Sequence, residues 1–426
     1  MNSKPTNTPF DYLRRKNGEE YSPEIRINWC KAREYVLDRL EGTFFCPNDS
    51  GHLHVMVAED SPLMLSVVRQ LALSAHYANY VEYDVSSTLV SKNRTVITIK
   101  SQNDHIVEEL GKEEYLCNLL EYCKYTVYGK EHNASSYIDI EFDIVKELPK
   151  ANVPNVMVIT EKEVNEYFKS KTDTKFHIDT LPAVLASGMY NLGDVIGNLP
   201  AEDFHCAKRY YQALDKFQYS QMNKDKDLPL IGDACKDNPI KVKERLSNLF
   251  CADCFKQRYK VIEKCFEEAL KKREKDKGKK LRKREREKLE EELFERHNEA
   301  LSRSEHERWV VEKLIMGYRP LNEAERLTYE SLFDDARKAY FKQLKNIASD
   351  PAHIDLCSYR ELRRVNPDDM KYDSFLMLAI PKILERRYRR GKRRCACTSG
   401  TDAPSCATIV RDFMEKVSSK ARKKRG

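Results

Sequence analysis

The chain has 426 residues, of which 41% are hydrophobic. That length and composition are enough for about two to three domains with buried cores. Thirteen cysteines, scattered and odd in number, are typical of reduced intracellular thiols and argue against a disulfide framework. The longest apolar run, near Phe375–Ile380, falls far short of the ~20 residues of a membrane helix, and the N-terminus carries no signal sequence. We expect a cytoplasmic protein without a membrane span.

The net charge of +7 is unevenly distributed along the chain. Residues 385–426 hold 14 Lys/Arg and 4 Asp/Glu, a net charge of +10, so residues 1–384 carry −3. We expect residues 391–426 to form a basic disordered tail. The tail either binds nucleic-acid phosphates, with an affinity that falls steeply with salt, or only solubilises the chain.

Strand and helix patterns alternate in the first part of the chain. Asp60 or Ser61 is placed to cap a helix that has Pro62 at its first position. This alternation predicts an α/β fold with a degenerate Rossmann-like parallel sheet. Helices are predicted over Ile25–Leu40, Leu63–His76, Asp104–Tyr122 and Lys162–Lys169, and strands over His52–Ala58, Thr95–Lys100, Tyr137–Val145 and Asn155–Thr160.

Charged and helical patterns dominate the second part, so the fold class is α/β followed by all-α. Lys271–Glu295 mixes acidic and basic residues with few aromatics, which favours a solvated helix or helical connector over a nucleic-acid site. Further helices are predicted over Glu323–Ile347, after the turn Leu356–Leu362 and over Pro367–Arg387. The expected domains are residues 1–50 (an N-terminal arm packed on the domain after it), 51–250 (the Rossmann-like α/β domain, with helices and loops over 176–250 packed on its sheet), 251–300 (a charged helical connector), 301–390 (a small helical domain) and 391–426 (the basic tail).

The turn after the first predicted strand is where a Rossmann-type sheet would bind phosphate. It reads Ala58–Met64 without a glycine, so the dinucleotide fingerprint is missing and NAD(H) is not expected. Asp60, Ser61 and, at the end of the second strand, Lys100 remain candidates for a degenerate cofactor or ligand site. Glu59 and Asp60 would carry the chemistry if the chain were an enzyme of nucleotide metabolism.

Other patterns bear on metal binding and catalysis. The same acidic turn is similar to the Mg²⁺-binding opening of response-regulator receiver domains, with Asp104 as the candidate phosphoacceptor. Cys251-x-x-Cys254 is the arrangement of two zinc ligands, but the remaining cysteines are irregularly spaced, which favours buried reduced thiols. No nucleophile with a matching motif accompanies the histidines. We therefore expect no catalytic constellation, metal or cofactor.

The most specific stretch is Ser304–Pro320, SEHERWVVEKLIMGYRP. Gly317 and Pro320 mark the end of a helix predicted over Leu301–Gly317. This helix face is either a buried stripe with satisfied polar tips or a ligand-binding surface. The residues at the spacing of one face are His306, Trp309, Val310, Lys313, Leu314 and Gly317.

This stretch resembles the repeat named after ryanodine receptors, the RyR domain. His306-x2-Trp309-x7-Gly317-Tyr318 matches its first half, and Leu356–Leu362 (LCSYREL) matches the L-V-P-[FY]-x-x-L segment of its second half, with serine in place of the proline. The form E-H-x-R-W-x-x-E-K-L-x-x-G-[YFW]-R-P-L is similar to the bacterial branch, in which the RyR domain follows a TrkA-N-like Rossmann domain.

The resemblance implies a regulatory protein. By position, the ligand-binding residues are His306, Trp309, Lys313, Tyr318, Arg319 and Tyr359. Aromatic rings would stack on a base, and a cation would neutralise phosphate. Trp309 and His306 are favoured as structural residues and Arg319 as an exposed contact.

Our leading hypothesis is a non-enzymatic cytoplasmic sensor that binds a nucleotide-like or other anionic ligand in signalling or antiphage defence, as a monomer or a homo-oligomer. The alternatives are a nucleic-acid-associated effector that uses the basic tail and charged helix, or the nucleotide-metabolism enzyme.

Overall fold

The computed structural model describes an α/β region and a later helical region. The helices and loops expected over residues 176–250 lie almost wholly outside the described residues. So do the basic tail and most of the helix predicted over Pro367–Arg387. The described residues are 15, 18–85, 88–149, 156–172, 247, 250–251, 253–347, 349–367, 369–370 and 373.

A mostly parallel six-stranded sheet forms the centre of the molecule, with the strand order β6-β5-β7-β4-β1-β8. Five strands run parallel, and β6 pairs antiparallel with β5 at one edge. This confirms the α/β region that the alternating pattern predicted. The strands are β1 (His54–Val57), β4 (Thr95–Lys100), β5 (Lys124–Val127), β6 (Lys130–His132), β7 (Ile140–Val145) and β8 (Val156–Ile159).

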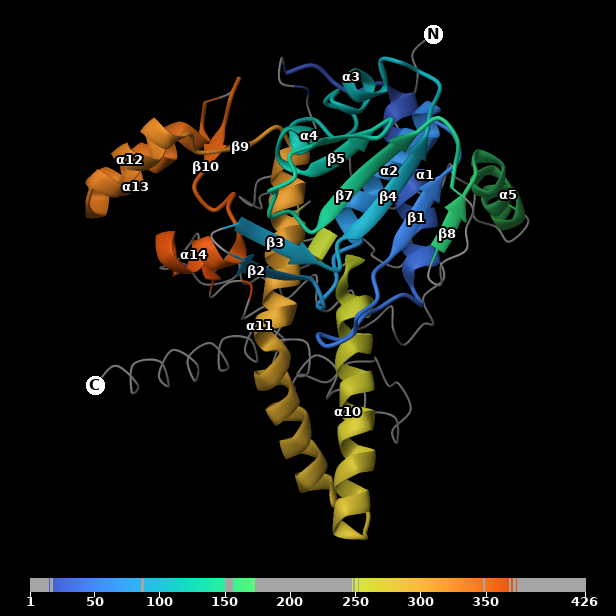
Figure 1. The fold of residues 1–426 in the computed structure, drawn as a ribbon, viewed down its shortest axis with the longest axis vertical. Coiled ribbons are helices and arrows are strands. Elements are labelled where there is room, and N and C mark those ends of the chain that lie inside the picture. The colour runs from blue at the N-terminus through green and yellow to red at the C-terminus, as the bar shows by residue number, and fades with distance from the viewer. Residues whose placement is uncertain are drawn as a thin grey trace, which may run out of the picture.

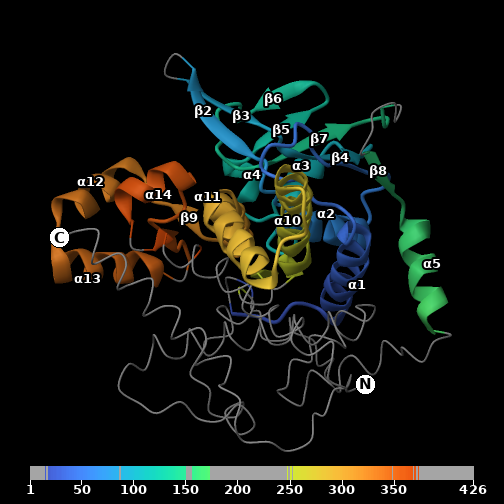
Figure 2. The ribbon, with the colours of Figure 1, turned by 90° about the horizontal axis from the view of Figure 1, so that it is seen from below.

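Helices α1, α2, α10 and α11 lie on one side of this sheet (Figure 2). α1 packs on α2, as expected of the N-terminal arm. Every residue of α2 from Leu63 to Ser74 is buried, because the helix lies between the sheet and the helices α1 and α11. The helices are α1 (Pro23–Leu40), α2 (Pro62–Ser74), α3 (Ile106–Leu110), α4 (Leu119–Tyr122), α5 (Glu161–Thr172), α10 (Phe255–Lys277), α11 (Lys283–Ile315), α12 (Glu323–Ser331), α13 (Asp334–Lys345) and α14 (Tyr359–Val365).

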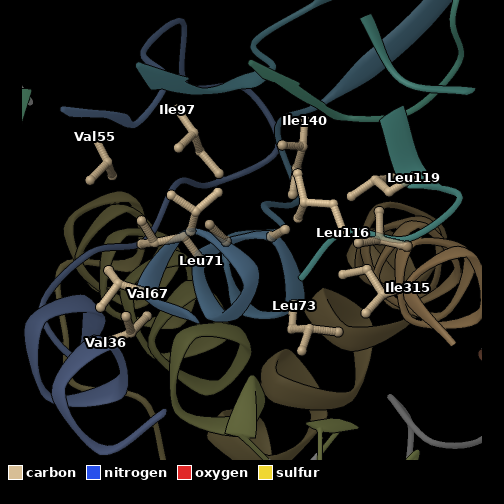
Figure 3. Close-up of a cluster of buried hydrophobic side chains, with 14 of the residues drawn as sticks. Val36, Val55, Val67, Leu71, Leu73, Ile97, Leu116, Leu119, Ile140 and Ile315 are labelled. Atoms are coloured by element: carbon tan, nitrogen blue, oxygen red, sulfur yellow. The ribbon is translucent and has the colours of Figure 1, made fainter. Parts of the chain in front are cut away.

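The main core lies between the sheet and these helices (Figure 3). Val55, Ile97 and Ile140, from three neighbouring strands, project toward Leu71 of α2, and all four side chains are completely buried. Ile315 at the end of α11 joins the same cluster. Each such side chain contributes about 1.5–3 kcal/mol through burial alone.

Two β-hairpins were not expected from the sequence. β2 (Val81–Val85) pairs antiparallel with β3 (Thr88–Lys92) as a separate two-stranded sheet. The other hairpin joins β5 to β6 through Tyr128 and Gly129, whose φ angles are 49° and 87°. Two consecutive left-handed residues are the geometry of a type I′ turn, which matches the twist of the flanking strands.

Two predicted helices are wrong in their continuity. The helix predicted over Asp104–Tyr122 is two short helices, α3 and α4, separated by turns that include Cys117 in a left-handed conformation. The helix predicted over Glu323–Ile347 is divided into α12 and α13, because Leu332 and Phe333 adopt extended backbone angles.

α10 and α11 form a long helical hairpin that projects from the rest of the described chain (Figure 1). Gly278 ends α10 in a left-handed conformation at φ 61°. α11 has 33 residues, so it is about 50 Å long at 1.5 Å per residue. The boundary expected between residues 300 and 301 lies inside this helix. None of the described helices combines the length and the apolar character that a membrane crossing needs.

Candidate functional site

The C-terminal half of α11 packs against the small helical elements that come after it in the chain. We call this part the helical module: residues 301–370, with α12, α13, α14 and a short parallel pair of β9 (Arg319–Pro320) and β10 (Ala352–His353). Gly317, at φ 81°, allows the chain to turn from α11 into β9. The module contains the six residues that the sequence singled out for ligand binding. Five of them contact one another directly or through His353, and Arg319 faces Glu325 and Asp350 instead.

His306 is buried inside the module. Its Nε2 bonds the carbonyl of Cys357 at 2.8 Å, and its Nδ1 lies 3.7 Å from the carboxylate of Asp373. Burial lowers the pKa of His306, but Asp373, the Cys357 carbonyl and the charge of Asp355 together outweigh burial and raise the pKa. The Tyr359 ring, also buried, lies 5.6 Å from the imidazole. His306 and Tyr359 therefore join α11 to the end of the module and face no solvent.

Trp309 is only half-buried and packs against the edge of the main hydrophobic core. Its ring stands 6.2 Å from the His306 ring in a stacked orientation. The Nζ of Lys313 lies 5.6 Å from the centre of the indole and 2.7 Å from Glu312 Oε1. An aromatic surface beside a cation is the arrangement that stacks on a base and attracts an anion.

His353 is the ring residue that the sequence did not reveal. It contacts Trp309 at 5.0 Å and Phe341 at 4.8 Å between ring centres, both edge to face. Its Nδ1 accepts a hydrogen bond from the backbone N–H of Asp355 at 3.3 Å. Burial lowers the pKa of His353 well below its ordinary value, so the ring is neutral and serves as packing. Only the fold brings it beside Trp309, since no motif marks it.

Tyr318 and Arg319 lie where α11 turns into β9. Tyr318 is buried, and its carbonyl accepts a hydrogen bond from Asn118 at 3.0 Å, which ties the module to the α/β region. The Arg319 guanidinium donates to Glu325 at 2.6 and 2.8 Å and to Asp350 at 2.7 Å. A ligand phosphate would have to compete with both carboxylates for Arg319.

A buried ionic network surrounds Arg308, next to Trp309 in the chain. Arg308 donates to Glu305 at 2.9–3.1 Å and to Glu312 at 2.7 Å. Arg258 of α10 lies 2.6 Å from the other side of Glu305. Burial alone would raise the pKa of Glu305, but the charges of Arg308 and Arg258 outweigh it and lower that pKa to about 2. Lys313 adds a third cation through Glu312.

A second polar cluster lies near the start of β7 and includes Glu307, the residue before Arg308 on α11. Glu307 is completely buried, and neither carboxylate oxygen has a hydrogen-bond partner among the described residues. Burial, with Glu82 and Asp139 nearby, raises the pKa of Glu307 well above its ordinary value. Burial also raises the pKa of Glu82 to about 7. Asp139 itself bonds His76 Nδ1 at 2.9 Å.

At the carboxyl edge of the sheet, the candidate polar side chains are bonded to other residues of the chain. Ser61 caps α2 by accepting from the Met64 N–H at 3.4 Å, and Asp60 accepts from Ser101 Oγ. Lys100 forms an ion pair with Glu147 at 3.2 Å. Glu59 accepts from the backbone N–H of Glu161 at 3.0 Å. These bonds hold the ends of β1, β4 and β8 together, and a ligand here would replace them.

The other candidate groups are placed apart from the module's ring cluster. Asp104 is exposed in a turn after β4 and pairs with Lys146 at 2.7 Å. Cys251 and Cys254 are buried free thiols, and Cys254 donates to the carbonyl of Ser74 at 3.7 Å. Among the described residues, no group of three or more His, Cys, Asp or Glu side chains is arranged to hold a metal ion.

Comparisons of the whole chain with protein-family models, with curated proteins and with solved structures found no match.

Proposed function

We propose that the chain is a regulatory protein in which a Rossmann-like α/β domain is joined to an RyR-type helical module. The module binds a nucleotide-like or other anionic ligand and passes the binding event along α11. The observation that carries the proposal is the half-buried Trp309 with Lys313 Nζ 5.6 Å from its ring. An indole and an ammonium at this separation match a base or other π-face that carries an anionic group.

The roles of the other signature residues follow from their burial. His306, Tyr318 and Tyr359 are buried and support the module, whereas Trp309 keeps a partly open ring. Arg319 braces β9 against Glu325 and Asp350. We therefore assign ligand contact to Trp309 and Lys313. Lys313 is paired with Glu312, and Arg319 with Glu325 and Asp350, so a ligand anion competes with a carboxylate for either cation.

A regulatory role is also supported by how α11 is built. Glu307 and Arg308 directly precede Trp309 on α11 and lie in two buried clusters, one near the start of β7 and one that includes α10. A ligand that moves α11 through Trp309 therefore acts on contacts shared with the rest of the described chain.

The test is a thermal-shift panel of nucleotides, including ADP-ribose derivatives, with tryptophan emission recorded in parallel. A true ligand raises the Tm and changes an emission component that is absent from Trp309→Phe. Lys313→Gln weakens binding, while the matched change at Arg363, exposed on α14, leaves binding unchanged. If no nucleotide raises the Tm and the Trp309 emission stays constant, the proposal fails.

A further inference from the structure

The tip of the α10–α11 hairpin carries a high density of positive charge. Residues 271–288 hold 12 Lys/Arg and 4 Asp/Glu, a net charge of +8 within 18 positions. The tip stands away from the sheet and from the helical module (Figure 1). Like charges this close repel one another, so the concentration of cations costs stability unless an anionic partner neutralises it.

The hairpin beneath these charges has its own small core and its own ion pairs. Leu281, Leu289 and Leu293 are buried between the two helices. Lys277 pairs with Glu285 at 2.7 Å, and Arg286 with Glu274 at 3.0 Å. These contacts use two of the four acidic residues of the tip, Glu274 and Glu285, and join the two helices to each other. The cations on the outside are therefore presented on a structured support.

Six basic side chains on the outside form no salt bridge with any described residue, and all six are exposed. They come from both helices and from the connection between them. A group of cations without salt bridges on a helical support matches a polymer of closely spaced phosphates. The six are Lys271, Lys272, Lys275, Lys279, Lys280 and Arg284.

We propose that this tip is a nucleic-acid-binding arm that contacts the phosphate backbone of a duplex. Residues 267–293 contain no Phe, Tyr or Trp, and single-stranded nucleic acid is bound by stacking bases on such rings. The one large apolar residue in the connection, Leu281, is buried, whereas a membrane-surface helix needs an exposed apolar face. Charge without rings or apolar surface therefore favours a duplex, read by its backbone and not by its bases.

The experiment measures how the Kd of the full chain for a labelled 30-base-pair DNA changes with salt. The test variant changes Lys275, Lys279, Lys280 and Arg284 to Gln. Each lost phosphate contact lowers the slope of log K against log salt by about 0.9, so we expect the slope to fall by about 2–4. The control changes the same number of exposed lysines elsewhere to Gln and should leave the slope intact: Lys130, Lys162, Lys338 and Lys342.

Deletion of residues 386–426 separates the hairpin from the basic tail. The proposal predicts that the salt slope lost in the hairpin variant is retained in this deletion. It is overturned if the deletion removes binding and the hairpin variant keeps it, or if the two four-residue variants behave alike. Stronger binding to anionic vesicles or to an acidic peptide than to duplex DNA would assign the arm to another partner and also overturn it.

Discussion

Substitution of Glu305 by Gln tests whether the buried ionic network holds α11 in place. The change keeps the shape of the side chain but removes the anion that lies between Arg308 and Arg258. Both guanidinium groups stay buried, and a buried charge that loses its partner costs about 3–5 kcal/mol. We therefore expect a large fall in the free energy of unfolding.

The pKa of Glu305 gives an independent magnitude. A change from 4.5 to about 2 corresponds to about 3 kcal/mol, because each tenfold change in the acid constant is worth about 1.4 kcal/mol. Since the pKa is lowered in the folded state, this stability is fully present above the unfolded pKa and is lost as pH falls toward 2. The difference between wild type and Glu305→Gln should shrink to about 1 kcal/mol at pH 3.

The assay is urea unfolding at pH 7 and at pH 3, with Glu325→Gln as the control. Glu325 also accepts two bonds from one arginine, Arg319, but that pair is nearer the surface. Exposed pairs of this kind are worth about 1 kcal/mol or less. A Glu305→Gln variant that is no less stable than Glu325→Gln would refute the reasoning, and so would a difference that is equal at both pH values.

Three further outcomes are expected. Glu307→Gln should be more stable than wild type at pH 8 by about 1–3 kcal/mol and equally stable at pH 4. The raised pKa of Glu307 makes the wild type lose stability as pH rises. Urea unfolding at both pH values measures the difference, and a variant that is no more stable at pH 8 would contradict the prediction. Cys265 should be alkylated before Cys46 at pH 6.5, because Cys46 is buried and Cys265 only half-buried, and because the interaction between the two thiols lowers the pKa of Cys265 and raises that of Cys46. Peptide mapping measures the order, and the reverse order would contradict the prediction. Leu71→Ala should lower the free energy of unfolding by about 2–5 kcal/mol. Leu327 is 56% exposed, so Leu327→Ala should change that free energy by less than about 0.5 kcal/mol. Similar losses in the two variants would contradict the placement of the core.

Local signals were readable from the sequence where one residue type fixes the backbone. Ser61 and Pro62 marked the start of α2, and Ser61 does accept the capping bond. Gly317 marked the end of α11 and occupies the left-handed region. The break between α12 and α13 was not readable, because neither glycine nor proline occurs at Leu332 and Phe333.

Long-range pairings could not be predicted, because no local pattern encodes them. Arg33 donates to Asp253 at 2.8 Å across 220 positions of sequence, and His353 meets Trp309 only when β10 pairs with β9. The acidic and basic residues of the hairpin were visible as a charged stretch. The sequence did not reveal that Glu274 and Glu285 pair with cations of the opposite helix while six exposed cations of the tip form no salt bridge with a described residue.

α11 carries the Trp309 ligand site, the Arg308 ionic network and one side of the basic hairpin tip. Trp309 follows Arg308 directly on α11, but neighbouring residues of a helix point in different directions. A ligand on the indole therefore reaches the Arg308 guanidinium, which two buried carboxylates hold, by moving the helix itself. A buried ion pair that is partly separated loses Coulomb energy and regains no hydration. A buried ionic network therefore switches between discrete arrangements and does not deform gradually. A ligand can shift such an equilibrium only by the difference in its affinity for the two arrangements. Arg258 of α10 and Arg308 of α11 both contact Glu305, so a second arrangement of this network would change how the two helices of the hairpin pack at their base.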